Sequence, residues 1–442
     1  MIWIELTIVL SVIFIGTKLK GISLGIMGGL GLAILTFFLH LQPTDPPFDL
    51  LLIITAVVTA ASTLEAAGGL RYLADLAEQL IRKYPHRITF IGPFITYLLT
   101  LLAGTGHIIY SILPVIATVA RETGVRPERP LSATVIAAQQ AVIASPISAP
   151  TAIIIGLLAP QGIELLDMLQ VLVPATLGGV VITTLVVSNL GKELHQDPVY
   201  LQNAQTSTQE ASDQSTPAQQ QYSVMANSAK LAVGLFMIGI VLIILLGTVK
   251  SLRPSWEVDG KTSLMAMPTI IEIMMLTIAA LIVLLCGLKP TEITKSSVFT
   301  AGIQAVIAIL GISWLGDTFF KANQAQIMEL AQDQITRHPW QFSIILFLMS
   351  ILLVSQTATI RALVPLGLSL GIPAVTLLAT LPAVNGLFFI PNYPTILAAI
   401  NLDRTGTTRV GKLVLNHSFM IPGLVATTTA VAIAFGLVQL LF

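Results

Sequence analysis

A cluster of hydroxyl and amide side chains surrounds one arginine late in the chain. Arg361 is the only Asp, Glu, Lys or Arg residue between Arg337 and Asp403, and the residues around the cluster are almost wholly apolar. Hydroxyl and amide groups donate hydrogen bonds to anionic oxygens, and a guanidinium adds a permanent positive charge. The segment therefore contains what a buried anion site needs. Its polar members are Ser355, Gln356, Thr357 and Thr359.

A second polar interruption occurs in the first half of the chain, inside the apolar stretch 88–120. Its glycines would let a ligand approach the backbone closely. The imidazole of its last residue could bind an anion or carry a proton, or it could simply be hydrogen-bonded inside a helical bundle. The interruption comprises Gly104, Thr105, Gly106 and His107.

A motif with two prolines follows each interruption. The motifs are "ASPISAP" at 144–150 and "IPNYP" at 390–394. Proline removes an N–H donor and clashes with the preceding turn, so each motif predicts a broken helix, although prolines in membrane helices are often only kinks. A helix that restarts after a break carries about half a positive charge at its N-terminus. We expect the breaks to complete the anion site with Ser145, Pro146, Ser148, Asn392, Tyr393, Pro394 and Thr395.

The composition indicates which class of protein positions these groups. Of 442 residues, 55% are hydrophobic and 10% are charged, whereas soluble domains carry about 25% charged residues. Many segments are apolar over the roughly 20 residues that a helix needs to cross a bilayer. The chain is therefore predicted to be an all-α polytopic membrane protein in contact with the lipid bilayer. The formal net charge of zero suggests no nucleic-acid partner, and the single cysteine, Cys286, excludes an intrachain disulfide.

Hydropathy predicts ten membrane spans, of which the fourth and the ninth contain the proline breaks. The interrupted stretches 88–120 and 340–372 are predicted to be re-entrant hairpins, because irregular backbone at membrane depth must line protein or a water-filled cavity. Two amphipathic stretches, 70–87 and 321–339, are predicted to lie along the membrane interface. The spans are 2–17, 22–40, 49–66, 131–160, 168–190, 230–249, 265–287, 297–316, 374–401 and 413–441.

The chain divides into two related halves. Residues 193–228 are rich in Gln, Ser, Thr and Ala, which predicts a flexible linker between a first repeat at 1–192 and a second at 229–442. Similar motifs recur in the same order on both sides of this linker. The recurring pairs include "LQPTD" (41–45) with "LKPTE" (288–292), Glu65 with Asp317, and Pro114 with Pro365.

The distribution of positive charge predicts the orientation. With both termini outside, sixteen Lys and Arg residues fall on inner loops, including the linker side, and five fall on outer loops. This excess agrees with the positive-inside rule. The "LQPTD" loop is then outside and the "LKPTE" loop inside, so the repeats have opposite topology, which is a signature of secondary transporters.

Several further residues have two interpretations each. Arg361 could face a cavity or extend to the outer surface. Glu272 could be a proton site or half of a structural pair, whereas Glu65 and Asp317 are expected to anchor the amphipathic helices. Asp403 lies in a loop that is either solvated or part of a gate. Additional candidates for the substrate site, inside the broken helices, are Gln139, Gln140 and Asn385.

Five longer motifs carry a family resemblance. They are "GTGHIIYSILP", "RPERPLSA", "ASPISA", "PNYPTILAAINLDRTGTTRVGK" and "NHSFMIPG". Together they resemble the anaerobic C4-dicarboxylate transporter (Dcu) family, and most of all its DcuA-like branch. The resemblance extends over nearly the whole chain.

The resemblance implies a carrier of the bacterial inner membrane that exchanges fumarate, malate or aspartate for succinate. It also implies the inverted repeats, paired hairpins and broken helices of the ion-transporter superfamily, an elevator-type mechanism, and a homodimer. Termini are then periplasmic and the linker is cytoplasmic, where a sensor kinase could also make contact. No metal site or cofactor is expected, apart from a coupling ion, either Na⁺ at the hairpin tips or H⁺.

Other functions remain open on the residues alone. A cation-coupled dicarboxylate uptake or efflux carrier would use the same groups, and an anion channel could use the same helix ends. An enzyme would need a paired nucleophile and base, and no such arrangement is found.

Overall fold

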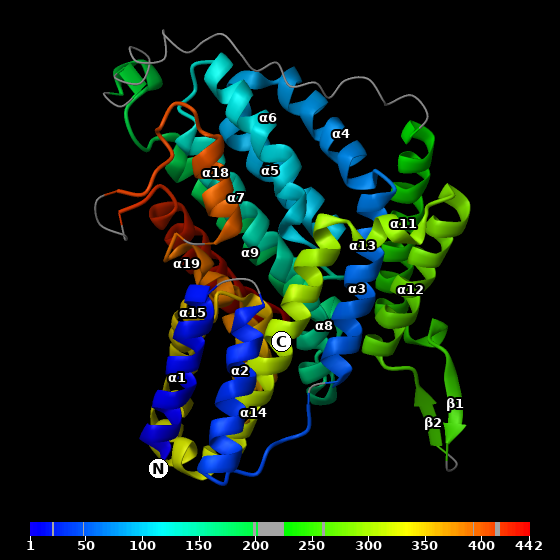
Figure 1. The fold of residues 1–442 in the computed structure, drawn as a ribbon, viewed down its shortest axis with the longest axis vertical. Helices are drawn as coiled ribbons and strands as arrows, with labels where there is room; N and C mark the ends of the chain where they lie inside the picture. Colours follow the sequence, from blue (N-terminus) through cyan, green and yellow to red (C-terminus); the bar gives the residue numbers. More distant parts are fainter. Residues whose placement is uncertain are drawn as a thin grey trace.

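The computed structural model describes residues 1–442 apart from 20–21, 47, 198–199, 202–224, 259–260, 392 and 412–415. The described chain is almost entirely helical (Figure 1). Within it, six helical segments are long and apolar enough to cross a membrane, and a bent helix pair would add a seventh crossing. The architecture is that of a polytopic membrane protein. The six segments are Pro85–Ala103, Glu128–Gln161, Leu165–Ser188, Asn227–Thr248, Met267–Cys286 and Met420–Leu441.

The helices follow one another with short connections in both halves. The first half contains α1 (Ile2–Leu19), α2 (Ser23–Ala33), the π-helix η1 (Ile34–Phe38), α3 (Phe48–Ala66), α4 (Gly69–Lys83), η2 (Pro85–Arg87), α5 (Ile88–Ala103), η3 (Gly106–Ile108), α6 (Ile109–Glu122), α7 (Glu128–Ala144), α8 (Ala149–Leu158), η4 (Ala159–Gln161), α9 (Leu165–Ser188) and η5 (Leu194–Gln196). The second half contains α11 (Met225–Thr248), η6 (Lys250–Leu252), β1 (Ser255–Val258), β2 (Lys261–Leu264), α12 (Met267–Cys286), α13 (Pro290–Thr294), α14 (Ser297–Arg337), η7 (Pro339–Gln341), α15 (Phe342–Leu353), α16 (Gln356–Ser369), α17 (Ala374–Thr380), η8 (Leu381–Phe388), α18 (Pro394–Leu402) and α19 (Met420–Leu441).

Helices α5 and α6 fold back on each other around Gly104, and α15 and α16 do so around Val354. Gly92 and Ile116 are equally far from Gly104 along the chain, and they meet across the pair. A Cβ atom at Gly92 would lie 3.0 Å from the side chain of Ile116. In the second pair, a Cβ atom at Gly367 would lie 3.0 Å from Phe342. Each pair is therefore an antiparallel helical hairpin. The 12 residues of α15 span about 18 Å, less than the hydrocarbon thickness of about 30 Å.

Both proline motifs coincide with interruptions of a helix. Helix α7 ends at Ala144 and α8 begins at Ala149. In the second half, α17 continues into the 3₁₀ segment η8, the regular helix stops at Phe388, and α18 begins at Pro394. Each helix therefore restarts at the second proline of its motif, which lies in the first turn of α8 and of α18.

The two halves use the same packing partners. Helix α1 packs on α2 as α11 packs on α12, and α2 packs on α14 as α12 packs on α3. Helix α5 packs on α7 as α15 packs on η8, and α6 packs on α18 as α16 packs on α8.

Among the helix pairs that join the halves, α3 with α14 and α9 with α19 are both antiparallel. In α3 and α14, Glu65 accepts hydrogen bonds from Ser297 and from the Val298 N–H, while a Cβ atom at Gly302 would overlap Val58. In α9 and α19, Thr183 donates to the carbonyl oxygen of Pro422 at 3.3 Å, and Gly178 lies against Ile433.

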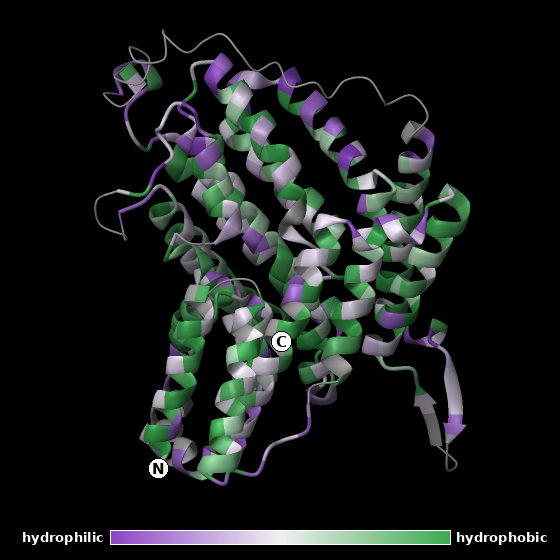
Figure 2. Ribbon diagram, viewed as in Figure 1, coloured by the Kyte–Doolittle hydropathy of each residue, from purple (hydrophilic) through white to green (hydrophobic). Residues whose placement is uncertain are grey.

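Hydrophobic residues extend along the packed helices, and hydrophilic residues concentrate on α4 and at helix ends (Figure 2). A large core includes residues of both hairpins and both broken helices. A second core joins α1, α2 and α14 to the tip of the second hairpin through Leu353 and Ala358. Helix α4 is amphipathic, since Leu73, Ala77 and Ile81 are buried along one side.

Helix α14 differs from the sequence prediction. A span at 297–316 followed by a separate amphipathic helix at 321–339 is wrong, because the structure has one helix of 41 residues, Ser297–Arg337. In the first half, Gly68 has a φ of 80° and separates α3 from α4; in the second half, the glycine next to Asp317, Gly316, stays helical and the helix continues unbroken.

Three smaller differences concern loops. The predicted linker begins at 193, yet Leu194–Gln196 forms a 3₁₀ turn and Asp197 is buried against Arg126, because their opposite charges pair. Most of the remaining linker lies outside the described residues. The strands β1 and β2 form an unpredicted antiparallel pair that projects from the helices (Figure 1). Helix α19 begins at Met420, later than predicted, because a bridge between Val410 and His417 precedes it.

Candidate functional site

Four buried amide residues lie where the second hairpin tip meets both broken helices, three joined through their side chains and Gln139 through its backbone carbonyl. Gln356 at the tip donates to the carbonyl oxygen of Gln139 at 2.8 Å and also to Oδ1 of Asn385. Asn385 donates to Oε1 of Gln140 at 3.1 Å. Each of the four side chains is 6% exposed or less. We call Gln139, Gln140, Gln356 and Asn385 the amide cluster.

The local sequence explains why Gln356 is at a tip. Val354 adopts a left-handed conformation with a φ of 49°, which ends α15. Ser355 then caps α16, since its Oγ accepts from the N–H of Ala358 at 3.2 Å. Thr359 donates to the carbonyl oxygen of Ser355 at 2.7 Å. The hydroxyls of Ser355 and Thr359 therefore stabilise the start of the helix, and Thr357 lies half-buried beside them.

Three of the predicted site residues have buried polar atoms without a partner in the structure. These atoms are both amide atoms of Gln139, Oγ1 of Thr395 and Nε of Arg361. Buried polar groups nearly always have hydrogen-bond partners, and an unsatisfied donor or acceptor costs about 1–3 kcal/mol. Their chemistry suits a polar ligand.

At the first break, hydroxyl groups of neighbouring residues hydrogen-bond to the interrupted backbone. Ser148 caps α8 by accepting from the N–H of Thr151 at 3.3 Å, and Thr151 donates to the carbonyl oxygen of Ser145 at 2.5 Å. Both serines and Pro146 are fully buried. In the structure, Ser145 and Ser148 hold the broken backbone in shape.

The tip of the first hairpin lies against this break. Gly104 ends α5 with a φ of 68°, and a Cβ atom there would lie 2.9 Å from Ile147. A Cβ atom at Gly106 would lie 3.7 Å from the side chain of Val142. Thr105 is half-buried between the two glycines. Only the backbone of His107, in η3, is described.

The second break is described in part. Tyr393 precedes α18 and is half-buried, Pro394 is the first residue of the helix, and Thr395 is buried behind it. Asn392 lies outside the described residues. Helix α18 packs on α6, so the second break lies beside the second arm of the first hairpin.

Arg361 forms an ion pair with Asp317 of α14. Its Nη2 is 3.4 Å from Oδ2 of Asp317, and the two side chains are 25% and 21% exposed. Gln356 and Arg361 are five residues apart on α16 and therefore about 140° apart around the helix. They have different partners for this reason.

Two other candidate residues have separate surroundings. Asp403 is buried and accepts hydrogen bonds from Thr405, Thr407 and the N–H of Thr408, so it organises the loop after α18. Glu272 is half-buried on α12, a helix that packs on α3 and α11.

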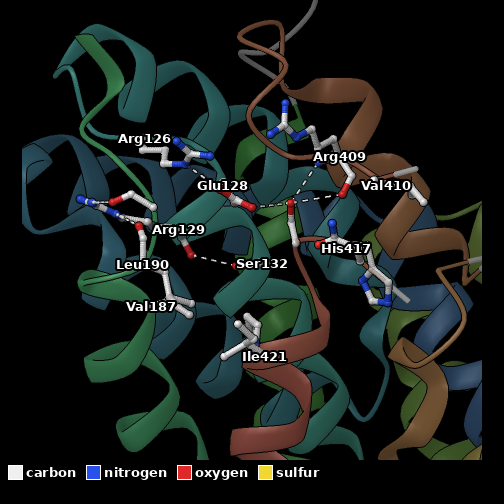
Figure 3. Close-up of a pocket in the computed structure, with 15 residues that line it drawn as sticks. Arg126, Glu128, Arg129, Ser132, Val187, Leu190, Arg409, Val410, His417 and Ile421 are labelled. Atoms are coloured by element: carbon white, nitrogen blue, oxygen red, sulfur yellow. Dashed lines mark hydrogen bonds and ion pairs between the residues drawn. The ribbon is translucent and has the colours of Figure 1, made fainter. Parts of the chain in front are cut away.

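A cavity of about 630 Å³ lies where α7 begins, α9 ends and α19 begins (Figure 3). Its wall includes Arg126, which donates to Glu128 at 2.6 Å and also pairs with Asp197. Burial lowers the pKa of Arg126, but the two carboxylates outweigh burial and raise the pKa above its ordinary value. Arg129 pairs with Glu193 at 3.1 Å. Most of the positive charge around the cavity is therefore balanced.

His417 connects this cavity to the second break. Its Nε2 lies 3.2 Å from the carbonyl oxygen of Phe389, and its Nδ1 accepts from the N–H of Phe419 at 3.2 Å. A carbonyl oxygen only accepts and a backbone N–H only donates, so the proton is on Nε2 and the ring is neutral. Burial also lowers the pKa of His417, although the Phe389 carbonyl partly offsets this effect.

Among the described residues, no three His, Cys, Asp or Glu side chains are grouped so that they could hold a metal ion. The coupling ion stays a prediction.

Comparison with known proteins agrees with the helical architecture. A family model described as "Anaerobic c4-dicarboxylate membrane transporter" matches residues 1–442. The chain belongs to this DcuA/DcuB family. The family resemblance predicted from the motifs is thus confirmed, and the chain is a membrane transporter rather than an enzyme.

Curated members of the Dcu family are similar over almost their entire length. The chain is 40% identical over 435 residues to the C4-dicarboxylate transporter DcuA of Wolinella succinogenes, covering 98% of each chain. It is 42% identical over 436 residues to DcuA of Escherichia coli K12, again covering 98% of each. It is 38% identical over 432 residues to the anaerobic C4-dicarboxylate transporter DcuB of Escherichia coli O6:H1, covering 97% of this chain and 96% of the relative.

For this Dcu family member, the structure brings only some of the candidate residues together. Gln356, Gln139, Gln140 and Asn385 form one cluster, and Gly104 adjoins the first break. Asp317 next to Arg361 was not predicted as a site residue. A charged side chain inside a membrane segment normally has a partner, and this rule would have directed attention to the acidic residues of the same half.

Proposed function

We propose that this chain exchanges C4-dicarboxylates, such as fumarate, malate or aspartate for succinate, across the bacterial inner membrane. The observation that carries the proposal is the amide cluster, in which one hairpin tip and both broken helices meet. Gln139 in this cluster has two buried amide atoms without a partner. An amide has both donors and acceptors, so it fits a carboxylate and, for aspartate, also an ammonium group.

A dicarboxylate has two anionic ends, and the second hairpin has two places for them. One carboxylate would lie at the amide cluster near the N-terminal end of α16, where the helix dipole favours negative charge. The other would bind Arg361, whose Nε has no partner among the described residues; because Gln356 lies about 140° away around α16, the Arg361 side chain would leave Asp317 and swing around the helix to reach this carboxylate. Thr395, at the first turn of α18, would donate its free hydroxyl.

The packing of the helices supports inverted repeats. In an inverted repeat, α9 would be the counterpart of α19, and α3 the counterpart of the first part of α14. Each of these two packed pairs would then be a contact between one element and its own counterpart in the other half. Both pairs are antiparallel, as elements related by opposite topology would be. Inverted repeats commonly surround a midplane substrate site in secondary transporters. We infer an elevator-type movement of the hairpins and broken helices against the remaining helices.

The cavity in Figure 3 would be the cytoplasmic approach to the second break. His417 lines it and contacts the carbonyl oxygen of Phe389, the residue at which the break begins. The termini are then periplasmic, as the distribution of positive charge predicts.

Counterflow in proteoliposomes tests the proposed function. Vesicles loaded with succinate should accumulate labelled fumarate or aspartate in a saturable way, whereas empty vesicles should not. Equal, unsaturable uptake by empty vesicles would indicate an anion channel. Uptake by empty vesicles that requires external sodium would indicate cation-coupled transport.

A further inference from the structure

The ion pair between Asp317 and Arg361 joins two groups of helices. Asp317 is on α14, which packs on α1, α2 and α3 and also directly on α16. Arg361 is on α16, which packs on its hairpin partner α15 and on α8 and η8 of the broken helices. The pair therefore connects the proposed moving part to helices outside it.

Asp317 uses only part of the binding capacity of Arg361. Its carboxylate lies 3.4 Å from Nη2, which is long for a charge-assisted hydrogen bond. The neighbouring Nε is buried and has no hydrogen-bond partner among the residues that the structure describes. Nε and Nη2 form one edge of the guanidinium, and such an edge binds a carboxylate through two parallel hydrogen bonds. A substrate carboxylate would therefore bind Arg361 better than Asp317 does, and the two carboxylates would compete for Nη2.

We propose that Asp317 makes transport an obligatory exchange. It does so by holding Arg361 whenever no dicarboxylate is bound, so that the empty carrier cannot move across the membrane. This inference rests on the proposed function. In the empty carrier, movement of α16 away from α14 separates two opposite charges at a site of low exposure. In the loaded carrier, the substrate carboxylate already neutralises Arg361, so movement leaves only Asp317 without a partner. The empty carrier is held in place, and the loaded carrier can move.

The chain offers a matched control for this role. Glu65 occupies the position in the first half that corresponds to Asp317. Its carboxylate accepts from Ser297 at 2.6 Å and from the N–H of Val298 at 2.8 Å, so it caps α14. Glu65→Gln therefore removes a negative charge at the equivalent place without touching Arg361.

The experiment compares two fluxes of labelled succinate from proteoliposomes, one into buffer with unlabelled succinate and one into buffer without any dicarboxylate. For Asp317→Asn, we expect efflux into substrate-free buffer to rise by about tenfold, as expected for loss of a partly buried ion pair. We also expect the KM for exchange to fall, because Arg361 no longer has a competing carboxylate. Asp317→Glu and Glu65→Gln should retain the tight coupling of the wild type.

The outcomes are distinguishable. Unchanged efflux into substrate-free buffer with intact exchange in Asp317→Asn would overturn the proposal for Asp317 alone. Weaker exchange with a raised KM would make Asp317 a structural support for Arg361 and would also overturn it. If the Asn variant does not reach the membrane, Asp317→Ser must give the same rise in efflux. Absence of counterflow in the wild type would overturn the proposed function together with this inference.

Discussion

The two hairpins have the same plan but different tips. The first tip presents glycine backbone, with Gly104 in a left-handed conformation against Ile147. The second tip presents side chains, with Gln356 in the amide cluster and Arg361 paired with Asp317. Under the proposed function, the second hairpin would recognise charge and polarity, whereas the first would close the site by close backbone packing.

The acidic residues before the hairpins differ in the same way. Glu65 caps the start of α14, so its role is structural, while Asp317 faces the one arginine of the second hairpin. Of the two acidic residues that the sequence comparison pairs, only Asp317 forms an ion pair with an arginine of a hairpin. The following predictions test how far this asymmetry extends.

The largest expected effect is that of Arg361→Ala. Removing a charge that binds a carboxylate at a partly buried site costs about 2–5 kcal/mol, so dicarboxylate exchange should fall by about a hundredfold while membrane insertion is retained. Counterflow of labelled succinate measures the effect, with Arg361→Lys as a control that keeps the charge but loses the paired donors. Unaltered uptake by the Ala variant would remove Arg361 from the site.

A smaller effect is expected for the amide cluster. Gln356→Leu and Asn385→Leu should each raise the KM for dicarboxylate exchange by about tenfold, since each leaves buried amides without partners. In the double variant, the loss of binding free energy should be smaller than the sum of the losses in the two single variants, because the two side chains hydrogen-bond to each other. Strictly additive effects would mean that the two amides act independently, contrary to the structure.

At the first hairpin tip, substitutions should change stability through steric contact rather than through charge. Gly104→Ala should lower the free energy of unfolding by about 1–2 kcal/mol, because the new methyl group meets Ile147 and the backbone requires a positive φ. Thermal unfolding in detergent measures the change. Gly106→Ala is the matched control, with its nearest contact at 3.7 Å, and an equal loss in both variants would contradict the assignment.

The smallest expected effect is that of pH on His417. Its pKa is below the ordinary value in the folded protein, so the unfolded chain binds the proton more readily. Stability should be complete above pH 6.5, the ordinary value, and should decrease as the pH falls below it. Thermal unfolding between pH 7.5 and about pH 5 measures this slope, which should be shallower in His417→Asn. Identical slopes in both proteins would exclude His417 as the source.

Local motifs were sufficient to predict where the backbone is interrupted. Proline at 146 and 391 and the polar residues at 104–107 and 355–359 mark the breaks, because their effects on helix geometry are local. The partners across the molecule were not predictable in this way. Gln356 and Gln139 are 217 positions apart, and only tertiary packing decides which face of α16 each neighbour meets.

The unbroken α14 illustrates the same limit. Gly68 lies just after Glu65 and Gly316 just before Asp317, and only Gly68 adopts a positive φ. A glycine permits such a turn but does not require it, so the sequence alone could not distinguish a bent pair of helices from a single one.

The length of α14 has a mechanical consequence. Its 41 residues correspond to about 60 Å, twice the hydrocarbon thickness of a bilayer. Asp317 lies near the middle of this rod, and Glu65 caps one end. Moving as one piece, such a rod would link a displacement of either end to Asp317 at its centre, and through the ion pair to Arg361.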